Sequence, residues 1–538
     1  ESCLANGNSA NYGGGSIYIN GPDTHISDSS FNNSKVGSNA YGGTIYIKGE
    51  RTIIDGSVFN KSSASQGGII YIEGEYAVID SSLFANSSAS KGGAISVNGD
   101  NATIRGSDFE NLKSSSTGGA IYVQGEDTNI LYSSFDSCLS TSASGGAIYI
   151  NDKDTIVAYS NFSSCKANSA GAIYINGTYT QISYCNLDNN TAGDAGAIKV
   201  FGNHTRIANS NFTNNNATGT DGGALDIGGT NASVYSCWFD NNDAVRNGGG
   251  INWKGGHGND TILGSTFTNN GCHGEGQGGG AIYWTAGDPD NIPPGGLILN
   301  CIFINNTAYG HHGGAIDWYY ARDSTINNCL FFNNTAYGDG GALYTGDQGG
   351  KGHHLMMSNC QFYNNTAMKH GGAIANQMSD SWIYNNTFDG NKAKASGGTI
   401  LMKEDHADNS VIDHCYIYNS FIDQTYTYSG KVNQFGVGGG AIRIDDNNIT
   451  ISNCAIINST ANKTWGGAVL VNSKDSSLVN VTIQNAHVLD GYGGAICWKG
   501  ERGTLNNVTI FNSSSTLLND ASAYFNYARA APAPLCAR

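Results

Sequence analysis

The chain has 538 residues, with 75 glycines, only 6 prolines and a formal net charge of −16 at pH 7. Hydrophobic residues make up 39% and aromatic residues 10%, which is too apolar for a disordered chain, and the scarcity of proline excludes a collagen. The acidic balance argues against binding of nucleic acid through its phosphates, and we expect no membrane insertion because no apolar run reaches about 18 residues. What remains is an ordered protein that needs glycine at many fixed backbone positions.

A hexapeptide of the type Gly-Gly-Ala-Ile-Tyr-Ile recurs along nearly the whole chain. Clear copies lie at residues 42–47, 67–72, 118–123 and 145–150, and successive copies are mostly 25 to 28 residues apart. Between them lies a second motif, a short β-rich run that ends in Phe and leads into Asn-rich turns, as at residues 212–215. One such repeat cannot bury its apolar face alone, whereas stacked repeats bury a continuous core. The pattern therefore predicts an all-β fold, a parallel β-helix (solenoid) of about 18 coils.

Alternation along each strand assigns its residues to two faces. Both aliphatic residues of the hexapeptide are expected to point inward, and one of these columns changes to Trp253, Trp284 and Trp318 in longer repeats. The paired glycines fit a bend where a Cβ would clash with the next coil. The residue between the aliphatic pair is expected to point outward, either to stack on sugar rings or to pack against a neighbouring molecule. This candidate surface or ligand-stacking ladder consists of Tyr18, Tyr46, Tyr71, Tyr122, Tyr149 and Tyr174.

The alternation of Gly-Gly-Ala-(Ile/Leu/Val) with Phe-x-x-Asn resembles the repeat pair of chlamydial polymorphic membrane proteins. It is also similar to the adhesin-like surface proteins of methanogenic archaea. The resemblance covers roughly residues 10–500 and implies a secreted, right-handed β-helix used for adhesion or envelope structure, without identifying a ligand. The Phe-x-x-Asn motif begins at Phe212, Phe239, Phe267, Phe303, Phe331, Phe362 and Phe388.

Sequons for N-glycosylation are dense, and several fall in predicted turns where a glycan could attach. In a chain this rich in Asn, Ser and Thr many sequons also arise by chance, so both explanations stay open. The candidate glycosylation sites are Asn86, Asn101, Asn176, Asn305, Asn333, Asn364 and Asn480.

The chain has 13 cysteines. Cys138 and Cys165 share one position in neighbouring repeats, three residues after Phe, and stacked strands lie within the Cα range of a disulfide, so this pair is the candidate disulfide. A second set, two residues before Phe, is expected to point inward as buried thiols that act as small apolar side chains. This set contains Cys301, Cys329, Cys360, Cys415 and Cys454.

The repeat pattern fades after about residue 512. We therefore predict a β-helix over residues 1–512 and a tail over residues 513–538 that caps the helix or contacts a neighbouring subunit. Cys3 and Cys536 lie at opposite ends and are candidate inter-subunit residues, which favours head-to-tail assembly of copies of the chain. The alternative is that the chain is a fragment of a longer surface protein.

Polysaccharide cleavage is the rival function, because parallel β-helices include pectin-degrading enzymes. Residues 256–258 (Gly-His-Gly), 445–446 (Asp-Asp) and 443–445 (Arg-Ile-Asp) resemble parts of the polygalacturonase motif set, but their order differs and the last one lacks its Lys. Asp226 and Asp317 take the outward position several coils apart, so we expect no stacked acid cluster. Turn histidines could hold a transition metal, although we favour solvated side chains. They are His257, His273, His311, His312, His353, His354 and His370.

The sequence as a whole predicts a non-enzymatic, extracellular protein of the cell surface, adhesin-like or structural, that assembles end to end into a filament or sheath and needs no cofactor. Its expected partners are other copies of itself, with cell-surface glycans as a further candidate. The alternative is a pectin-lyase-like protein that binds or degrades polysaccharide.

Overall fold

The computed structural model describes residues 2–255, 260–274, 277–285, 295–346, 352–404, 406–423, 437–516 and 523–525. The chain divides into a first compact unit, Glu1–Val245 with Gly249–Trp253, and a second, Arg246–Gly248 with Lys254–Arg538. All regular structure in these residues is β-strand, and none of it is a helix long and apolar enough to span a membrane. The prediction of an all-β parallel solenoid of about 18 turns is confirmed.

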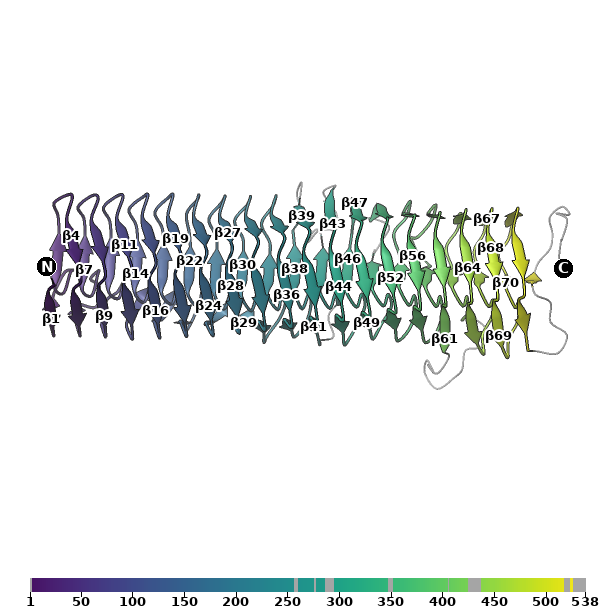
Figure 1. Ribbon diagram of the computed structural model, residues 1–538, viewed down its shortest axis with the longest axis horizontal. Coiled ribbons are helices and arrows are strands. Elements are labelled where there is room, and N and C mark those ends of the chain that lie inside the picture. Colours follow the sequence, from purple (N-terminus) through teal and green to yellow (C-terminus); the bar gives the residue numbers. More distant parts are fainter. Residues whose placement is uncertain are drawn as a thin grey trace. The chain divides into compact units, whose positions relative to one another are not determined.

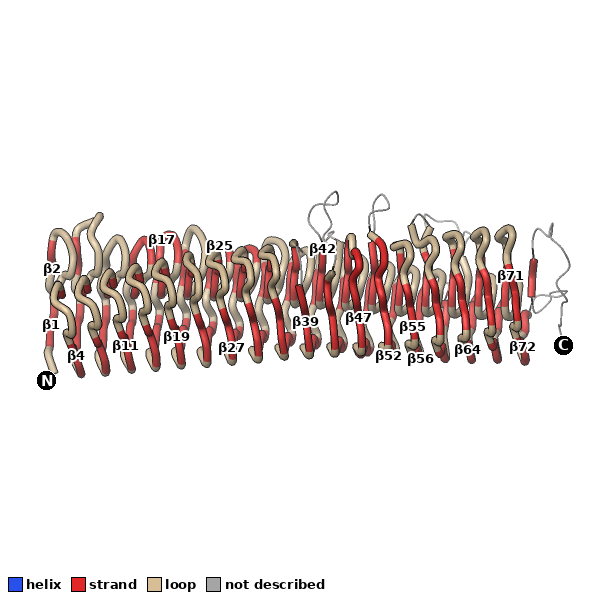
Figure 2. The backbone as a smooth tube through the Cα atoms, turned by 90° about the horizontal axis from the view of Figure 1, so that it is seen from above, coloured by secondary structure: helices blue, strands red, loops and turns tan. Residues whose placement is uncertain are grey.

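Each turn is built from up to four short strands joined by tight corners (Figure 2). One turn of the first unit consists of β18 (Ile121–Val123), β19 (Asn129–Leu131), β20 (Ser134–Asp136) and β21 (Leu139–Ser140). One turn of the second unit consists of β46 (Ile316–Tyr319), β47 (Arg322–Asn327), β48 (Leu330–Phe332) and β49 (Thr335–Ala336). Each strand pairs in parallel with the strand at the same place in the next turn (Figure 1). Within each unit these pairings form four sheets. We number them first to fourth in the order in which their strands follow one another in a turn, so that β18 lies in the first sheet, β19 in the second, β20 in the third and β21 in the fourth.

The first sheet contains the strands of the Gly-Gly-Ala-Ile-Tyr-Ile motif. In the first unit they are β3 (Ile17–Ile19), β7 (Ile45–Ile47), β10 (Ile70–Ile72), β14 (Ile95–Val97), β18, β22 (Ile148–Ile150), β26 (Ile173–Ile175), β30 (Ile198–Val200), β34 (Leu225–Ile227) and β38 (Ile251–Lys254). In the second unit they are β42 (Ile282–Thr285), β46, β50 (Leu343–Gly346), β54 (Ile374–Asn376), β58 (Ile400–Met402), β62 (Ile442–Ile444), β66 (Val469–Val471), β70 (Ile496–Trp498) and β74 (Ala523–Phe525).

The predicted inward columns form the core. Both aliphatic residues of the motif are buried, as Ile45 and Ile47 show with no exposed surface. The phenylalanines of the third sheet stack on one another with nearly parallel rings, and the centroids of Phe135 and Phe162 lie 4.7 Å apart. The stacked rings thus contribute a column of close contacts to the core.

The three tryptophans of the longer repeats also point inward, as predicted. Trp253 of the first unit has no exposed surface, and in the second unit Trp284 and Trp318 stack at 4.6 Å and are 3% and 2% exposed. Gly296, which lies in β43 (Gly296–Leu299), makes room for them, because a Cβ there would lie 2.6 Å from the Trp318 ring. The bulky indoles are therefore accommodated by a residue without a side chain.

The glycine pair marks the corner before each strand of the first sheet. Its first member has a left-handed backbone, as Gly118 does at φ 63°, and two turns have Ala170 and Ala195 there instead, at φ 59° and 55°. Its second member lies against the backbone of the following turn, and a Cβ on Gly119 would lie 1.8 Å from the carbonyl oxygen of Gly146. The predicted clash between turns is confirmed for the second glycine of the pair.

The Phe-x-x-Asn motif forms the corner between the third and fourth sheets. Its Asn is buried and bonded to the turns on either side. Asn334 donates to the carbonyl of Phe303 and to Oδ1 of Asn365, each at 3.0 Å, and accepts from Asn306 at 3.0 Å. The preceding residue, Asn333, is exposed in the left-handed region at φ 56°. The motif is therefore explained by the backbone of the corner, without a ligand.

Asn334→Ala is expected to cost about 1–3 kcal/mol of unfolding free energy, because it leaves the buried backbone N–H of Asn306 without its acceptor. Asn333→Gly, one residue away, is expected to change stability by no more than about 0.5 kcal/mol, since glycine keeps the left-handed backbone. Urea unfolding of both variants checks this. Equal losses would show that the inner asparagine column does not stabilise the corner.

Candidate functional site

The predicted ladder of outward tyrosines is only partly a surface. Tyr18 is 53% exposed and Tyr46, Tyr149 and Tyr174 are half-buried, but Tyr71 and Tyr122 are 8% and 5% exposed. The residue just before the glycine pair covers them. Tyr41 stacks on Tyr71 at 4.7 Å, and Nζ of Lys91 lies 4.7 Å from the ring centroid of Tyr122. The prediction of an open six-residue ladder is therefore wrong for Tyr71 and Tyr122.

Tyr149 and Tyr174 of this ladder use their ring faces on neighbouring rings, whereas Tyr18 and Tyr46 meet edge to face at an interplanar angle of 76°. The rings of Tyr149 and Tyr174 are stacked at 4.9 Å and 7°, and those of Tyr122 and Tyr149 at 5.6 Å. A sugar ring binds an aromatic side chain through the ring face. Inside such a ladder only ring edges and hydroxyl groups are available, so the geometry does not favour sugar stacking at these positions.

A second, more exposed tyrosine ladder lies at the corner after the second sheet of the first unit. Tyr132, Tyr159 and Tyr184 are 63%, 47% and 52% exposed, and their rings stack at 4.8 Å with interplanar angles of 7° and 2°. We call these three residues the tyrosine triad. Sequence analysis missed it because it searched only the strands of the hexapeptide for outward aromatic residues.

The backbone of the tyrosine triad is unusual for aromatic residues. All three have left-handed φ angles, of 52°, 53° and 54°, a conformation that costs a residue with a Cβ about 1–2 kcal/mol. Stacking offsets part of this cost, at about 0.5–1.5 kcal/mol per pair. The other turns of this unit place small or polar residues at the same corner: Asp28, Gly56, Ser81, Gly106, Asn209 and Ser236. The aromatic side chains are therefore not required by the fold.

A cluster of ionisable side chains lies on the outer face of the first sheet in the second unit. It consists of His312, Asp339, Tyr344, His370 and Lys403, and we call it the Lys403 cluster. Nζ of Lys403 lies 3.3 Å from Asp339 and 3.4 Å from the hydroxyl of Tyr344. Lys403 reaches back over Ala375, whose small side chain leaves space between Tyr344 and Leu401.

Both histidines of the Lys403 cluster are neutral. The backbone N–H of Asp339 donates to Nδ1 of His312 at 3.0 Å, and burial lowers the pKa of His312 to about 4. Arg443 donates to the Ser396 hydroxyl at 2.7 Å, and the oxygen of that hydroxyl lies 2.6 Å from Nδ1 of His370. Burial likewise lowers the pKa of His370. The bond that Nδ1 of His312 accepts places the proton of this imidazole on Nε2.

Two carboxyl groups at this face behave in opposite ways. Burial alone would raise the pKa of Asp339, but the positive charges of Lys403 and of the two histidines, which protonate at acidic pH, outweigh it and lower that pKa, so Asp339 is ionised. Asp317 lies in the outward column next to Tyr344, is fully buried, and neither of its carboxyl oxygens has a hydrogen-bond partner. Burial raises the pKa of Asp317 well above its usual range, so it is held protonated.

The structure corrects one expectation about this face. His312 and His370 are largely buried in a polar network rather than solvated, whereas His354 is exposed and pairs with Asp323 at 3.1 Å. Asp339, which the sequence did not single out, stands at the corner position before the glycine pair. His257 and the rest of its Gly-His-Gly motif fall among residues 256–259, outside the described part of the chain.

In the first unit the scattered charges of the same column are also brought together. Lys199 forms ion pairs with Asp194 and with Asp226, the latter at 3.0 Å. Among the residues that the structure describes, no group of three His, Cys, Asp or Glu side chains has the arrangement of a metal site.

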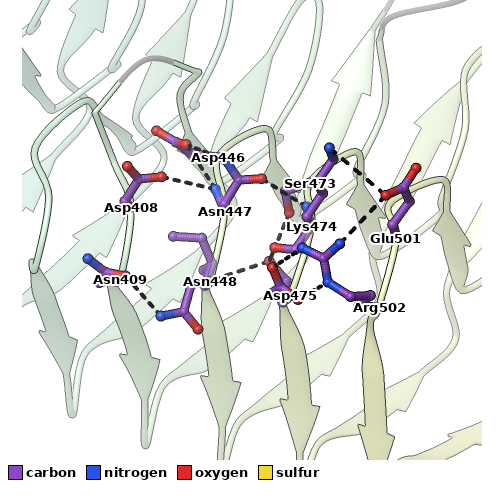
Figure 3. Close-up of polar contacts among 12 residues, drawn as sticks. Asp408, Asn409, Asp446, Asn447, Asn448, Ser473, Lys474, Asp475, Glu501 and Arg502 are labelled. Carbon is purple, nitrogen blue, oxygen red and sulfur yellow. Dashed lines mark hydrogen bonds and ion pairs between the residues drawn. The ribbon is translucent and has the colours of Figure 1, made fainter.

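In the second unit, charged and polar side chains link successive turns at the corner that follows the strands of the first sheet (Figure 3). The N–H of Asn447 donates to Asp408 at 3.3 Å and to Asp446 at 2.8 Å, and a hydrogen bond between these two carboxyl groups raises the pKa of Asp408 to about 6. Arg502 binds both oxygens of Asp475 with its guanidinium, at 2.6 and 2.5 Å. Donor groups of a neighbouring turn bind these carboxyl groups, so the bonds of this surface connect the corners of successive turns.

The cysteine predictions have mixed outcomes. Cys301, Cys329 and Cys360 are buried, as predicted. Cys138 and Cys165 are buried free thiols rather than the predicted disulfide, and each Sγ lies 3.7 Å from a Phe carbonyl oxygen in the preceding turn. Cys3 is exposed, and Cys536 lies outside the described residues.

The predicted sequons have a common structural origin. In the Asn-Asn-Thr turns the first Asn is exposed and left-handed, the second is the buried Asn of the corner, and Thr begins the fourth sheet, as at residues 333–335. Asn101 is half-buried and the other six candidates are exposed. Several of their amide groups are also bonded to the preceding turn, as Nδ2 of Asn333 donates to Asn305 at 2.7 Å. Glycosylation at these sites stays a prediction.

Comparison with known proteins gives one family match. Residues 328–346 and 359–377 match the model of the Chlamydia polymorphic membrane protein (Chlamydia_PMP) repeat, which agrees with the chlamydial part of the predicted resemblance. The archaeal part stays a prediction. The matched segments contain the Phe-x-x-Asn corner and the glycine-pair corner described above. A search of curated proteins found no match.

Several solved structures are similar at low identity. The PL6 family alginate lyase AlyGC is 9% identical with a TM-score of 0.32, covering 98% of this chain and 97% of that one. The Streptococcus pneumoniae surface protein and adhesin PfbA is 10% identical with a TM-score of 0.23, covering 91% and 92%. The catalytic domain of a GH87 α-1,3-glucanase is 12% identical with a TM-score of 0.15, covering 93% and 64%. Similarity at this level carries no argument about function.

Proposed function

We propose that this protein is a non-catalytic, adhesin-like protein of the cell surface that binds glycans. The observation that carries the proposal is the tyrosine triad, where exposed aromatic side chains occupy corners whose backbone disfavours them. Aromatic side chains with an apolar ring and a polar hydroxyl are suited to sugar binding. The match of two turns to the Chlamydia polymorphic membrane protein repeat supports a location at the cell surface.

Binding of the full chain to a printed array of cell-surface glycans tests this function. We expect retention of the chain on a restricted set of glycans, and competition by the same free oligosaccharides. Absence of binding across the array, together with absence of adhesion to cells that display those glycans, would overturn it.

End-to-end assembly is a separate part of the proposal, which rests on the sequence. Copies of the chain are expected to associate into a filament or sheath under non-reducing conditions. Light scattering and electron microscopy of the untreated protein check this, and a monodisperse species of about the chain mass, 56.3 kDa, would contradict it.

Polysaccharide cleavage is the second candidate function, favoured by the Lys403 cluster and Asp317. Ionisable groups with strongly shifted pKa values that gather on one face are typical of catalytic sites. However, Lys403, Asp339 and Tyr344 satisfy one another, and the two histidines are hydrogen-bonded inside the network. Because these groups are bonded to one another, the arrangement stabilises this face of the sheet and favours binding of a polysaccharide without its cleavage.

A further inference from the structure

We infer that one face of the Tyr132 ring is a subsite for a single pyranose ring of a cell-surface glycan. The inference rests on the proposed glycan-binding function and assigns it to named residues. Tyr159 has a triad ring on both of its faces, whereas Tyr132 stacks on Tyr159 alone. The preceding turn has Gly106 at the same corner, so no side chain takes the next position of the ladder there. Tyr132 is also the most exposed member of the tyrosine triad.

The space over Gly106, next to the free face of the Tyr132 ring, has room for one more flat ring in the stack. The ring centroids of the triad are 4.8 Å apart, which is the spacing of neighbouring strands in a sheet. A Cβ on Gly106 would come no closer than 3.4 Å to its nearest neighbours, Asp80 and Ser81, so the corner is not crowded. A flat ring can therefore lie on Tyr132 in the place that a further aromatic side chain would fill.

Polar groups stand on the second-sheet side of this space. β15 (Thr103–Arg105) ends at Arg105, immediately before Gly106, and Nε and Nη2 of Arg105 bind Asp80 at 2.8 and 2.7 Å. Ser81 donates to the same carboxylate at 2.9 Å. These bonds outweigh burial and lower the pKa of Asp80, so the pair is charged. Arg105 is 53% exposed and keeps Nη1 available for a hydroxyl group.

A second polar pair stands on the third-sheet side. β16 (Asp108–Glu110) begins two residues after Gly106, and the hydroxyl of Ser134 donates to Asp108, which is exposed. An apolar platform with polar groups on both edges matches a pyranose, whose C–H face packs on an aromatic ring while its equatorial hydroxyls project sideways to donors and acceptors. A purely apolar partner would leave these charged groups without new bonds, so the geometry favours a sugar.

The test compares variants of the full chain for binding to the oligosaccharide that the wild type retains most strongly on the glycan array, by calorimetry. Tyr132→Asn removes the platform and Gly106→Asn covers it, while both residues suit a left-handed corner, as Asn209 shows in the same unit. Each is expected to weaken binding by at least about fivefold. Tyr184→Asn, at the opposite end of the tyrosine triad, is the matched control and is expected to leave the affinity within about twofold.

The outcomes separate the subsite from the proposed function. Wild-type binding with unchanged affinity in Tyr132→Asn and Gly106→Asn would overturn the subsite and leave glycan binding in place. Absence of wild-type binding would overturn both. An equal loss in Tyr184→Asn would contradict the assignment to the Tyr132 face. Unchanged thermal unfolding of the three variants, which the left-handed backbone predicts, excludes misfolding as the cause of a loss.

Discussion

Gly119→Ala is expected to disrupt the turns around it and to destabilise the chain more than Gly118→Ala in the neighbouring position. A Cβ on Gly119 would lie 1.8 Å from the Gly146 oxygen and 2.8 Å from the Leu139 nitrogen, which are backbone atoms that can move only if the turns separate. Such a clash between stacked turns is expected to cost about 3–5 kcal/mol, in the range of the most destabilising substitutions.

Gly118 supplies the matched control. It has a left-handed backbone at φ 63°, and the same corner position holds Ala170 at φ 59° in another turn of the first unit. A Cβ on Gly118 would lie 2.2 Å from the carbonyl oxygen of Ile121 in the same turn, so the corner must relax as it does around Ala170. Because no neighbouring turn has to move, Gly118→Ala is expected to cost about 1–2 kcal/mol, less than Gly119→Ala. Denaturant unfolding followed by circular dichroism measures both variants. Equal losses for the two, or a Gly119→Ala chain as stable as the wild type, would contradict the stacking of corners described here.

Asp317→Asn is expected to stabilise the second unit increasingly as the pH rises. The carboxyl of Asp317 is buried and protonated in the folded chain, whereas in the unfolded chain it ionises near its ordinary pKa of 3.8. Above that pH the folded state binds more protons than the unfolded state, so this group makes the wild type lose stability by about 1.4 kcal/mol per pH unit until its folded-state pKa is reached. An amide at residue 317 does not titrate and removes this dependence.

The two buried histidines act in the opposite direction. The pKa of His312 is lowered from 6.5 to about 4, so between these pH values the unfolded chain binds a proton that the folded chain does not. Their contribution therefore makes stability fall as the pH is lowered, in wild type and variant alike. The difference in unfolding free energy between Asp317→Asn and the wild type, measured from pH 4 to pH 8, isolates Asp317. A difference that does not change with pH would contradict a protonated carboxyl at this place.

The repeating parts of the fold could be predicted from the sequence because one side-chain period determines them. Ile45 and Ile47 alternate with an outward residue, and the Phe column follows at a fixed distance, so strand faces and stacking follow from spacing. Even Trp253 could be placed inward by its register with these columns.

The functional surfaces could not be predicted in the same way, because they lie at corners rather than on strands. Asp339 precedes a glycine pair, in a corner segment whose side chains do not alternate as they do on a strand, and yet it lies beside His312. Tyr132 occupies a single left-handed residue between two strands, where side-chain direction does not follow alternation. The thiols of Cys138 and Cys165 share a column, as predicted, but the spacing does not determine which way each Sγ points.

The most direct test of this account is to incubate the full chain with the glycan that it binds and to follow the length of that glycan by mass spectrometry. The account predicts that the glycan is recovered intact after prolonged incubation, while binding persists in the Lys403→Met variant and is weakened in Tyr132→Asn. Shortened glycan chains that the wild type produces and Lys403→Met does not would contradict it, and would establish the Lys403 cluster as a catalytic site.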